Sequence, residues 1–391
     1  MQQKYQGNIW KLTLAMMTND VSFSIGVSVL YMLHLGLDLG QISLVVSAWL
    51  VFSTLGNIPA GIFADRYGNK LSIVCGGVLF LVGTVLFALA GGFYWLVAGY
   101  ALMGFGSALK QGADQALLYN GLNLDGKKSL FKSTFGRMDF VNNITTGVLM
   151  SLIGGFLFTI NPRWPFIAEI ILVVISLVAI GLLKDVKVSK KRDSVWSDLQ
   201  KSFQQAFIRP NFSRIFIFSA LIGSVALTTI QYVQPVYKDI GVNSWYYGLL
   251  AATMFIFRGV GAWYSDKLGK IFSVDKYLVL HAGVFGLFLM FIQRTKEIFF
   301  ILPILAIFFF LRGLYSPTVS TWINEKVGSK NRATMLSINS QILTLVTSIS
   351  LYFTGIVAVK YDLSMTFYVL SVFSLILLIS YILVVRRIET K

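Results

Sequence analysis

Five ionisable side chains lie inside long apolar runs, where the chemistry open to them is the binding of protons or ions. They are Asp20, Lys110, Asp114, Arg258 and Arg312. A charge placed in hydrocarbon costs at least about 2.5–3.5 kcal/mol, so such residues normally mark a function or a partner. The sequence has no nucleotide-binding loop and no cluster of catalytic side chains, and Cys75, His34 and His281 lack metal-ligand spacing. These residues therefore favour proton or ion binding without a metal, a cofactor or ATP, and argue against an enzyme.

Asp20 is the best candidate for a proton-binding residue. It lies near the middle of the first apolar run, in the polar sequence Thr18-Asn19-Asp20, where desolvation favours the protonated carboxyl. Such a group could take up and release protons. The alternative is a fixed ion pair with a basic residue.

Lys110 and Asp114 are spaced i,i+4, so on one continuous helix their side chains reach each other. Mutual neutralisation and a role in substrate binding are both open. Glu169 lies near the end of another apolar run, where it could snorkel to the surface or pair with Arg163.

Arg258 and Arg312 have no acidic residue within four positions along the chain. Their partner must come from another helix, a lipid or an anionic ligand. Arg312 stands at the head of a polar face that includes Tyr315, which favours a place in a cavity. Arg258 could equally form a structural ion pair.

The chain that positions these groups is a membrane protein by composition. Of its residues, 56% are hydrophobic and 13% are charged, and the mean hydropathy is +0.72. A spanning helix needs roughly 20 apolar residues, and continuous runs of this length argue against a β-barrel. We expect an all-α fold with about twelve spans, at residues 8–33, 40–64, 71–91, 94–121, 134–160, 164–183, 212–238, 244–265, 274–293, 297–324, 332–358 and 364–385.

The distribution of basic residues predicts the orientation of the helices, because Lys and Arg are retained on the cytoplasmic side. If the N-terminus is inside, three of the 33 basic residues fall inside spans, and the only ones that face outward are Arg163, Lys238, Arg294, Lys296 and Lys360. Both termini should then be cytoplasmic. The formal net charge of +16 is a topology signal with some attraction to anionic lipids, and nucleic-acid binding is not needed to explain it.

The longest polar stretch divides the predicted spans into two groups of six. Residues 184–211 combine basic side chains with apolar ones at three- and four-residue steps, which indicates a short amphipathic helix on the membrane surface, ended by Pro210. A solvated linker with aromatic anchors is the preferred interpretation, and a regulatory site is the alternative. The expected domains are six-helix bundles at 1–183 and 212–391, with the linker between them.

A charged turn between the second and third predicted spans has a weaker counterpart in the second half. Asp65-Arg66-Tyr67-Gly68-Asn69-Lys70 follows Gly61, and Asp266-Lys267-Leu268-Gly269 occupies the corresponding place later in the chain. The first turn resembles the signature G-x-x-x-D-R/K-x-G-R/K-R/K of the major facilitator superfamily, complete except for Asn69.

The resemblance covers essentially the whole chain and implies two six-helix bundles related by pseudo-two-fold symmetry. Arg137 and Arg332, which follow the fourth and tenth predicted spans, support such a duplication. Residues 112–119 and 331–334 also look like the bacterial drug-efflux branch of this superfamily.

Asp65 ends the second predicted span, where the negative end of the helix dipole disfavours a carboxylate unless a positive group approaches. In related transporters, the residue that matches Asp65 contacts the start of the eleventh helix and an arginine near the connection between the fourth and fifth helices, here Arg137. The resemblance thus implies a latch on the cytoplasmic side, built from Gly61, Asp65, Arg66, Gly68, Lys70, Arg137 and Asp266. Arg66 and Lys70 could instead serve only to anchor the topology.

Two departures from the family pattern weaken a standard proton-antiport assignment. Ala101 lies near the place of the fourth-span arginine that is typical of proton-coupled exporters. Of the fifth-span motif G-x-x-x-G-P-x-x-G-G, only Gly154-Gly155 survives. Neither departure affects the expected fold.

Polar residues on several spans form the expected lining of a central cavity, namely Asn142, Asn143, Gln231, Tyr232, Gln234, Tyr315 and Asn339. Together with the ionisable residues, they fit a monomeric secondary transporter of the bacterial cytoplasmic membrane that works by alternating access. We expect a small amphipathic substrate, exported in exchange for protons. Uptake or exchange of a polar metabolite, flipping of a lipid headgroup held by the two arginines, and a non-transporting receptor or scaffold are the alternatives.

Overall fold

The computed structural model describes residues 7–16, 23–183, 210–269, 271–292, 295, 297–327 and 332–389. Every regular element in these ranges is helical, as the sequence predicts. The chain divides into two compact units. Unit 1 holds the described residues of Met1–Leu37, Ala48–Arg192 and Asn243–Ala252, and unit 2 holds those of Asp38–Ser47, Asp193–Val242 and Thr253–Lys391.

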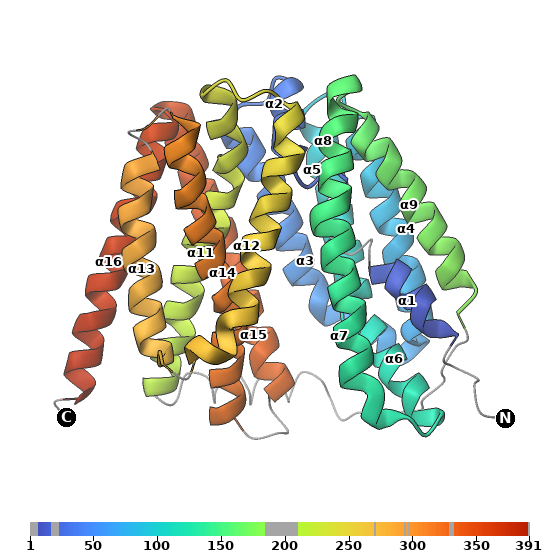
Figure 1. Ribbon diagram of the computed structural model, residues 1–391. Coiled ribbons are helices and arrows are strands. Elements are labelled where there is room, and N and C mark those ends of the chain that lie inside the picture. The colour runs from blue at the N-terminus through green and yellow to red at the C-terminus, as the bar shows by residue number, and fades with distance from the viewer. Residues whose placement is uncertain are drawn as a thin grey trace. The chain divides into compact units, whose positions relative to one another are not determined.

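Unit 1 is a bundle of helices from the first half of the chain, joined by the start of α12 (Trp245–Gly269) (Figure 1). Its elements are α1 (Asn8–Met16), α2 (Ser28–His34), most of α3 (Leu39–Tyr67), α4 (Asn69–Ala88), α5 (Phe93–Lys110), α6 (Ala113–Leu124), the 3-10 turn η1 (Lys128–Leu130), α7 (Phe131–Asn142), the π-helical stretch η2 (Asn143–Met150), α8 (Ser151–Ile160) and α9 (Trp164–Gly181). α4 packs along α5 and α9, and α1 packs against α9. An apolar cluster that includes Leu12, Ile73, Leu117 and Ile180 forms part of the core of this bundle.

The contact between α4 and α5 rests on glycines that recur two turns apart on each helix. A Cβ atom at Gly76 would lie 2.5 Å from the carbonyl oxygen of Gly106, and one at Gly83 would lie 2.5 Å from that of Gly99. Side chains are therefore excluded from this contact. Membrane helices gain much of their packing energy from such close backbone approach.

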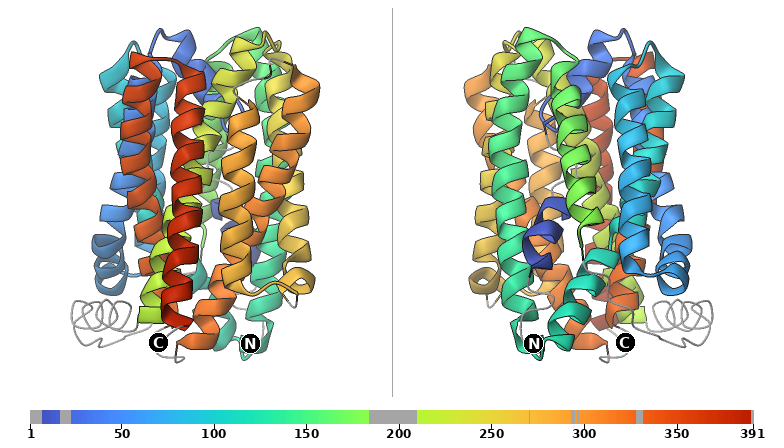
Figure 2. Two further views of the ribbon diagram at one scale, coloured as in Figure 1. Left: turned by 90° about the vertical axis from the view of Figure 1, so that its left-hand side faces the viewer. Right: turned by 90° about the vertical axis from the view of Figure 1, so that its right-hand side faces the viewer.

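Unit 2 contains the later part of α12 (Trp245–Gly269) together with α11 (Pro210–Asp239), α13 (Val274–Ile292), α14 (Ile298–Lys326), α15 (Arg332–Lys360) and α16 (Leu363–Glu389). α13 packs along α16, and the two lie side by side in orange and red in Figure 2 (left). α11 packs along α15. Helices that do not follow one another in the chain thus pack side by side within the unit.

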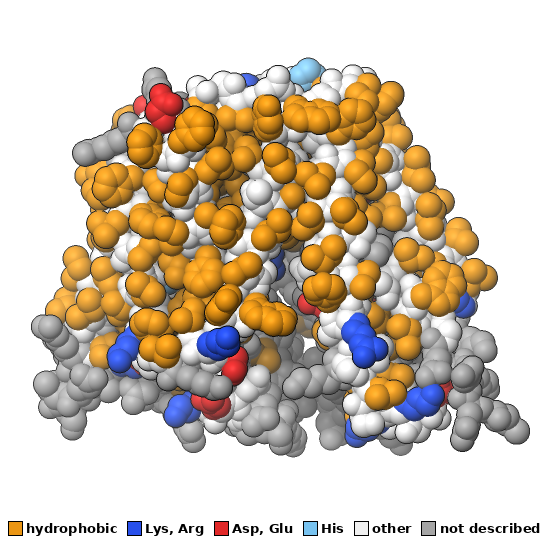
Figure 3. Space-filling view, viewed as in Figure 1, with side chains coloured by type: hydrophobic (Ala, Val, Ile, Leu, Met, Phe, Trp, Pro, Cys, Tyr) orange, Lys and Arg blue, Asp and Glu red, His pale blue; other side chains and the backbone are white. Residues whose placement is uncertain are grey.

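Nine helices in the described part of the chain are long and apolar enough to cross a membrane, and each matches a predicted span. The other three predicted spans coincide with α1 and α2, with α5 and α6, and with α12. Figure 3 shows hydrophobic side chains over most of the helix sides, with most of the visible Lys and Arg near helix ends. This is the distribution of a multi-pass membrane protein.

Two of the predicted spans are wrong as single helices. α5 ends at Lys110 and α6 begins at Ala113, and between them Gly112 has a φ angle of 85°, which glycine adopts without steric cost. The sequence around this break is polar, from Lys110 to Gln115, but polar residues alone do not show that a helix ends. The predicted span 8–33 is likewise not one helix, because residues 23–27 between α1 and α2 form turns.

Candidate functional site

The charged turn found in the sequence joins α3 to α4 in unit 1. α3 ends at Tyr67, and Gly68, with a φ angle of 98°, turns the chain into α4. The Lys70 ammonium donates to the carbonyl oxygens of Gly181 and Leu183, both at 2.8 Å. Lys11 donates to the carbonyl oxygen of Leu182 at 2.6 Å. Two lysines therefore donate to three carbonyls at the end of α9. The last carbonyls of a helix have no N–H donor within the helix and carry a negative partial charge.

Replacing Lys70 with methionine is expected to lower the unfolding free energy by about 1–2 kcal/mol, because charge-assisted bonds to a helix end are lost. The thermal melting temperature of the purified protein in detergent measures this effect. Arg66→Met is the matched control, since Arg66 is exposed, its Cζ lies 5.3 Å from the ring centroid of the adjacent Tyr67, and within the described residues it forms no hydrogen bond or ion pair. Equal melting temperatures for the two variants would contradict a capping role for Lys70.

The other residues of the predicted latch are distributed over both units. Gly61 and Asp65 lie exposed on α3, and Arg137 lies exposed on α7, all in unit 1. Asp266 lies exposed near the end of α12 in unit 2. The latch itself stays a prediction.

Lys110 and Asp114 are both buried, but on opposite sides of the break between α5 and α6. The expected i,i+4 arrangement on one helix is therefore wrong. The Lys110 ammonium lies 4.3 Å from the ring centroid of Phe80, and its charge attracts Asp114. Asp114 Oδ1 accepts the backbone N–H groups of Gly112 and Gln115 at 3.1 and 2.7 Å, so this carboxylate caps the start of α6.

A second carboxylate is buried in unit 1. Glu169 on α9 is only 1% exposed, and its Oε2 accepts a hydrogen bond from the Ser24 hydroxyl at 2.8 Å. The expectation that Glu169 snorkels is therefore wrong, because its head group is enclosed by protein. Asp20, the predicted proton-binding residue, lies outside the described residues.

Unit 2 carries the two predicted arginines on neighbouring helices. Arg312 on α14 is half-buried, with its Cζ 5.2 Å from the ring centroid of Tyr315, and Arg258 on α12 is exposed, with its Cζ 6.0 Å from that of Phe255. The two positive charges repel each other. Among the residues that the structure describes, neither guanidinium forms an ion pair or hydrogen bond.

Sequence reasoning missed a buried histidine beside Arg312. His281 on α13 is 0% exposed, and its Nδ1 lies 2.6 Å from the Tyr277 hydroxyl, which donates to the carbonyl oxygen of Leu311 at 2.9 Å. His281 Nε2 is buried and has no hydrogen-bond partner within the described ranges. The i,i+4 spacing of Tyr277 and His281 was the available signal, although their bond to α14 leaves no trace in the sequence.

Two of the predicted cavity residues in unit 2 bond to neighbouring helices. The Tyr232 hydroxyl lies 3.0 Å from that of Ser43 and donates to Thr354 at 2.9 Å. Asn339 donates to the Ser219 hydroxyl at 3.3 Å. Both contribute to packing between helices, whatever else they contact.

The remaining predicted cavity residues differ in exposure. Gln231 and Gln234 are half-buried on α11. Asn142, the last residue of α7, is buried and accepts from Thr146 at 3.1 Å, whereas Asn143, the first residue of η2, is exposed and donates to the carbonyl oxygen of Asp139 at 2.8 Å.

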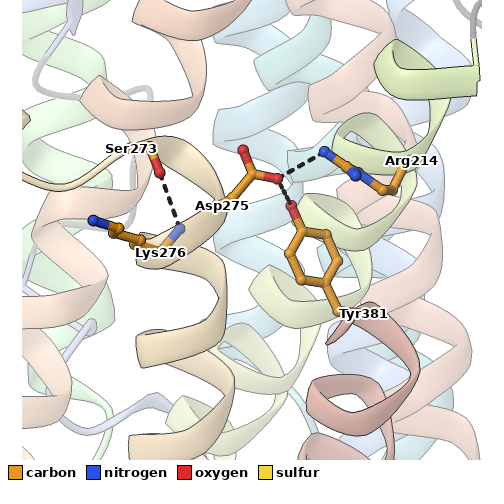
Figure 4. A network of polar contacts seen from close by, with 5 residues as sticks. All are labelled: Arg214, Ser273, Asp275, Lys276 and Tyr381. Carbon is orange, nitrogen blue, oxygen red and sulfur yellow. Dashed lines mark hydrogen bonds and ion pairs between the residues drawn. The ribbon is translucent and has the colours of Figure 1, made fainter. Parts of the chain in front are cut away.

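One cavity of about 1550 Å³ lies within unit 2, between the start of α11 and α13 and the ends of α12, α14 and α16. A polar network at its edge ties three helices together (Figure 4). Asp275 Oδ1 accepts from Arg214 Nη2 and from the Tyr381 hydroxyl, both at 2.7 Å. Sequence reasoning missed this network too, because the three residues lie on three different helices.

Comparison with known proteins identifies the family. The sequence matches the Major Facilitator Superfamily over residues 12–349. The uncharacterised MFS-type transporter YxaM of Bacillus subtilis (strain 168) is 22% identical over 371 residues, which cover 91% of this chain and 90% of that one. The quinolone resistance protein NorA of Staphylococcus aureus (strain MSSA476) is 24% identical over 318 residues, which cover 77% and 76% of the two chains.

Solved transporter structures share the fold. The nucleoside transporter NupG superposes with a TM-score of 0.79 at 13% identity, covering 98% of this chain and 99% of that one. A bacterial homologue of the human lysosomal transporter Spinster, inward-facing and unoccupied, superposes with a TM-score of 0.73 at 16% identity, covering 97% and 96%. The family match spans most of the chain and agrees with this fold, and the protein therefore belongs to the Major Facilitator Superfamily, whose members are transporters and not enzymes.

Proposed function

We propose that this protein is a secondary transporter that exports a small amphipathic organic compound across the bacterial cytoplasmic membrane in exchange for protons. It works as a monomer by alternating access, with both termini in the cytoplasm. The similarity to the quinolone resistance protein NorA over 77% of the chain is the observation that carries the export of an amphipathic compound.

Ionisable groups inside apolar helices support coupling to protons. Asp20 is the proposed proton carrier, and the buried carboxylate of Glu169 in unit 1 supports a role for acidic groups within the helices. Lys110 and Asp114 sit at a helix break, where backbone groups are freed from helical bonding. Asp65 and Arg137 belong to the proposed latch on the cytoplasmic side.

Dye movement in proteoliposomes tests this function. An imposed pH gradient should drive ethidium, a cationic amphipathic dye, or 8-anilinonaphthalene-1-sulfonate, an anionic one. Asp20→Asn is expected to reduce pH-driven movement to the level of protein-free liposomes, because an amide cannot carry a proton.

Asp362→Asn is the control, since Asp362 is exposed and its Oδ1 accepts the N–H of Met365, a bond that an asparagine can also make. This variant should retain full pH-driven movement. Failure of both dyes to move faster than in empty liposomes would reject the transport function. Unchanged pH-driven movement in Asp20→Asn would remove Asp20 from proton coupling.

A further inference from the structure

We propose that Arg258 and Arg312 form a binding site for an organic anion, one that carries a carboxylate, sulfonate or phosphate group beside an apolar body. This inference names the substrate class of the transporter proposed above and rests on that function. It is carried by the placement of the two guanidinium groups, by the absence of an acidic partner for them among the described residues and by their aromatic neighbours.

The two arginines leave their helices where the backbones of α12 and α14 meet. Gly313 directly follows Arg312, and a Cβ atom at Gly313 would collide with the carbonyl oxygen of Arg258. The charges of the two side chains repel each other across this contact. Two long cationic side chains that start from touching backbones can close on one anion from two sides.

No acidic side chain in the described part of unit 2 neutralises this pair. Two hydroxyls beside Arg312 are already engaged, because that of Tyr315 donates to the carbonyl oxygen of Ser219 at 2.8 Å and that of Tyr277 donates to the carbonyl oxygen of Leu311 at 2.9 Å. Like charges without a counter-ion are unfavourable in a membrane helix bundle. A bound anion relieves both their repulsion and the loss of solvation.

The helix face that carries Arg258 is turned toward protein at the start of α12. Ala251 lies about two turns before Arg258 on the same face. A Cβ atom at Gly26 would lie 3.0 Å from the Cβ of Ala251, so at Ala251 the helix packs against another part of unit 1. Arg258 continues the same face with an exposed guanidinium that a ligand can reach.

The chemistry of the two side chains selects an anion with an apolar body. Each guanidinium offers five N–H donors in a planar fork, which matches the oxygens of a carboxylate, sulfonate or phosphate. The rings of Tyr315 and Phe255 lie beside the two charged groups. Apolar and aromatic surface next to a few orienting polar groups is typical of sites for organic ligands.

Three naphthalene derivatives that differ in charge test the site: 2-naphthoate, 2-naphthamide and 2-naphthylmethylammonium. We expect 2-naphthoate to bind the full-length protein in neutral detergent and to raise its melting temperature more than the other two. Arg258→Gln and Arg312→Gln should each weaken this binding at least about tenfold, because charge-assisted hydrogen bonds are lost. The affinity of Arg312→Lys for 2-naphthoate should lie between those of the parent protein and Arg312→Gln, since lysine keeps the charge but lacks the planar set of N–H donors. Lys267→Gln, an exposed change on α12, should leave binding unchanged.

Several results would overturn the inference: equal stabilisation by 2-naphthylmethylammonium, binding of 2-naphthoate that survives in the double glutamine variant, or no preference for charge in the series. If a glutamine variant fails to fold, as shown by its melt without ligand, Arg258→Lys and Arg312→Lys carry the comparison. Added phosphatidylglycerol, compared with phosphatidylcholine, identifies the source of the anion. If phosphatidylglycerol competes with 2-naphthoate, the site binds a lipid headgroup. If it does not compete, the site binds a soluble anion, and either result supports an anion site.

These binding measurements require no transport. Intact, arginine-dependent binding of 2-naphthoate without pH-driven movement of either dye would reject the proposed function alone. Conversely, pH-driven movement of ethidium without any charge-selective binding would reject the anion site alone.

Discussion

Replacing Gly313 with alanine is expected to force α12 and α14 apart and to lower the unfolding free energy by about 3 kcal/mol. The new Cβ atom would collide with the carbonyl oxygen of Arg258, and would lie 2.9 Å from its carbonyl carbon and 3.0 Å from the backbone nitrogen of Ala262. All three are backbone atoms, so no side-chain rotation can make room. The effect therefore falls at the upper end of the roughly 1–3 kcal/mol that overpacking usually costs.

Gly259→Ala is the matched control for this substitution. Gly259 lies on α12 next to Arg258, and a Cβ atom there would meet nothing within 4 Å. Alanine at that position should be neutral or stabilising by up to about 1 kcal/mol, because glycine is the poorer helix former. Melting temperatures in detergent compare the two variants. If Gly313→Ala melts at the same temperature as Gly259→Ala, the two backbones do not meet as described.

The sequence predicts the helices well because apolar runs of spanning length leave the backbone no alternative in a membrane. It predicts the turn between α3 and α4 for a second reason, since charged residues and Gly68 interrupt the apolar pattern there. It fails at Gly112, because the polar residues on either side of it, Lys110 and Asp114, are equally compatible with one continuous helix. A positive φ angle is a local backbone property that hydropathy does not record.

For the candidate site, too, the sequence shows some features and hides others. An ionisable residue in an apolar run is visible in the sequence, so Lys110, Arg258 and Arg312 could be identified. Which group it faces is decided by helix packing. The bond between Ser24 and Glu169 joins residues 145 positions apart, and the one between Tyr277 and Leu311 joins residues 34 positions apart. Neither separation follows from a local period of 3.6 residues.

Lys70 shows how a motif residue can have a local role that its family signature does not describe. The signature places Lys70 in a gating turn, and its ammonium is bound to carbonyl oxygens at the end of α9. These carbonyl oxygens are free to accept because α9 ends at Gly181. The role of Lys70 therefore depends on a segment far from it in the sequence. The charged turn is thereby attached to the sixth predicted span within unit 1.

Asp275→Ala is expected to lower the unfolding free energy by about 3 kcal/mol, because it leaves a largely buried arginine without its counter-charge. Arg214 is 11% exposed and Asp275 is 36% exposed, so the loss falls at the lower end of the range for broken buried pairs. The substitution also removes the acceptor of the Tyr381 hydroxyl. It thus removes the polar links from α13 to α11 and α16 at the edge of the cavity.

Arg214→Met with Asp275→Leu should recover much of this loss, since a buried ion pair replaced by apolar side chains of similar size is often neutral. The double variant separates the effect of an unpaired charge from that of the missing pair. Glu325→Ala, which removes an exposed carboxylate from the lining of the same cavity, should change the melting temperature little. If Asp275→Ala and Glu325→Ala melt alike, or if the double variant is no more stable than Asp275→Ala, then Asp275 does not act by neutralising Arg214.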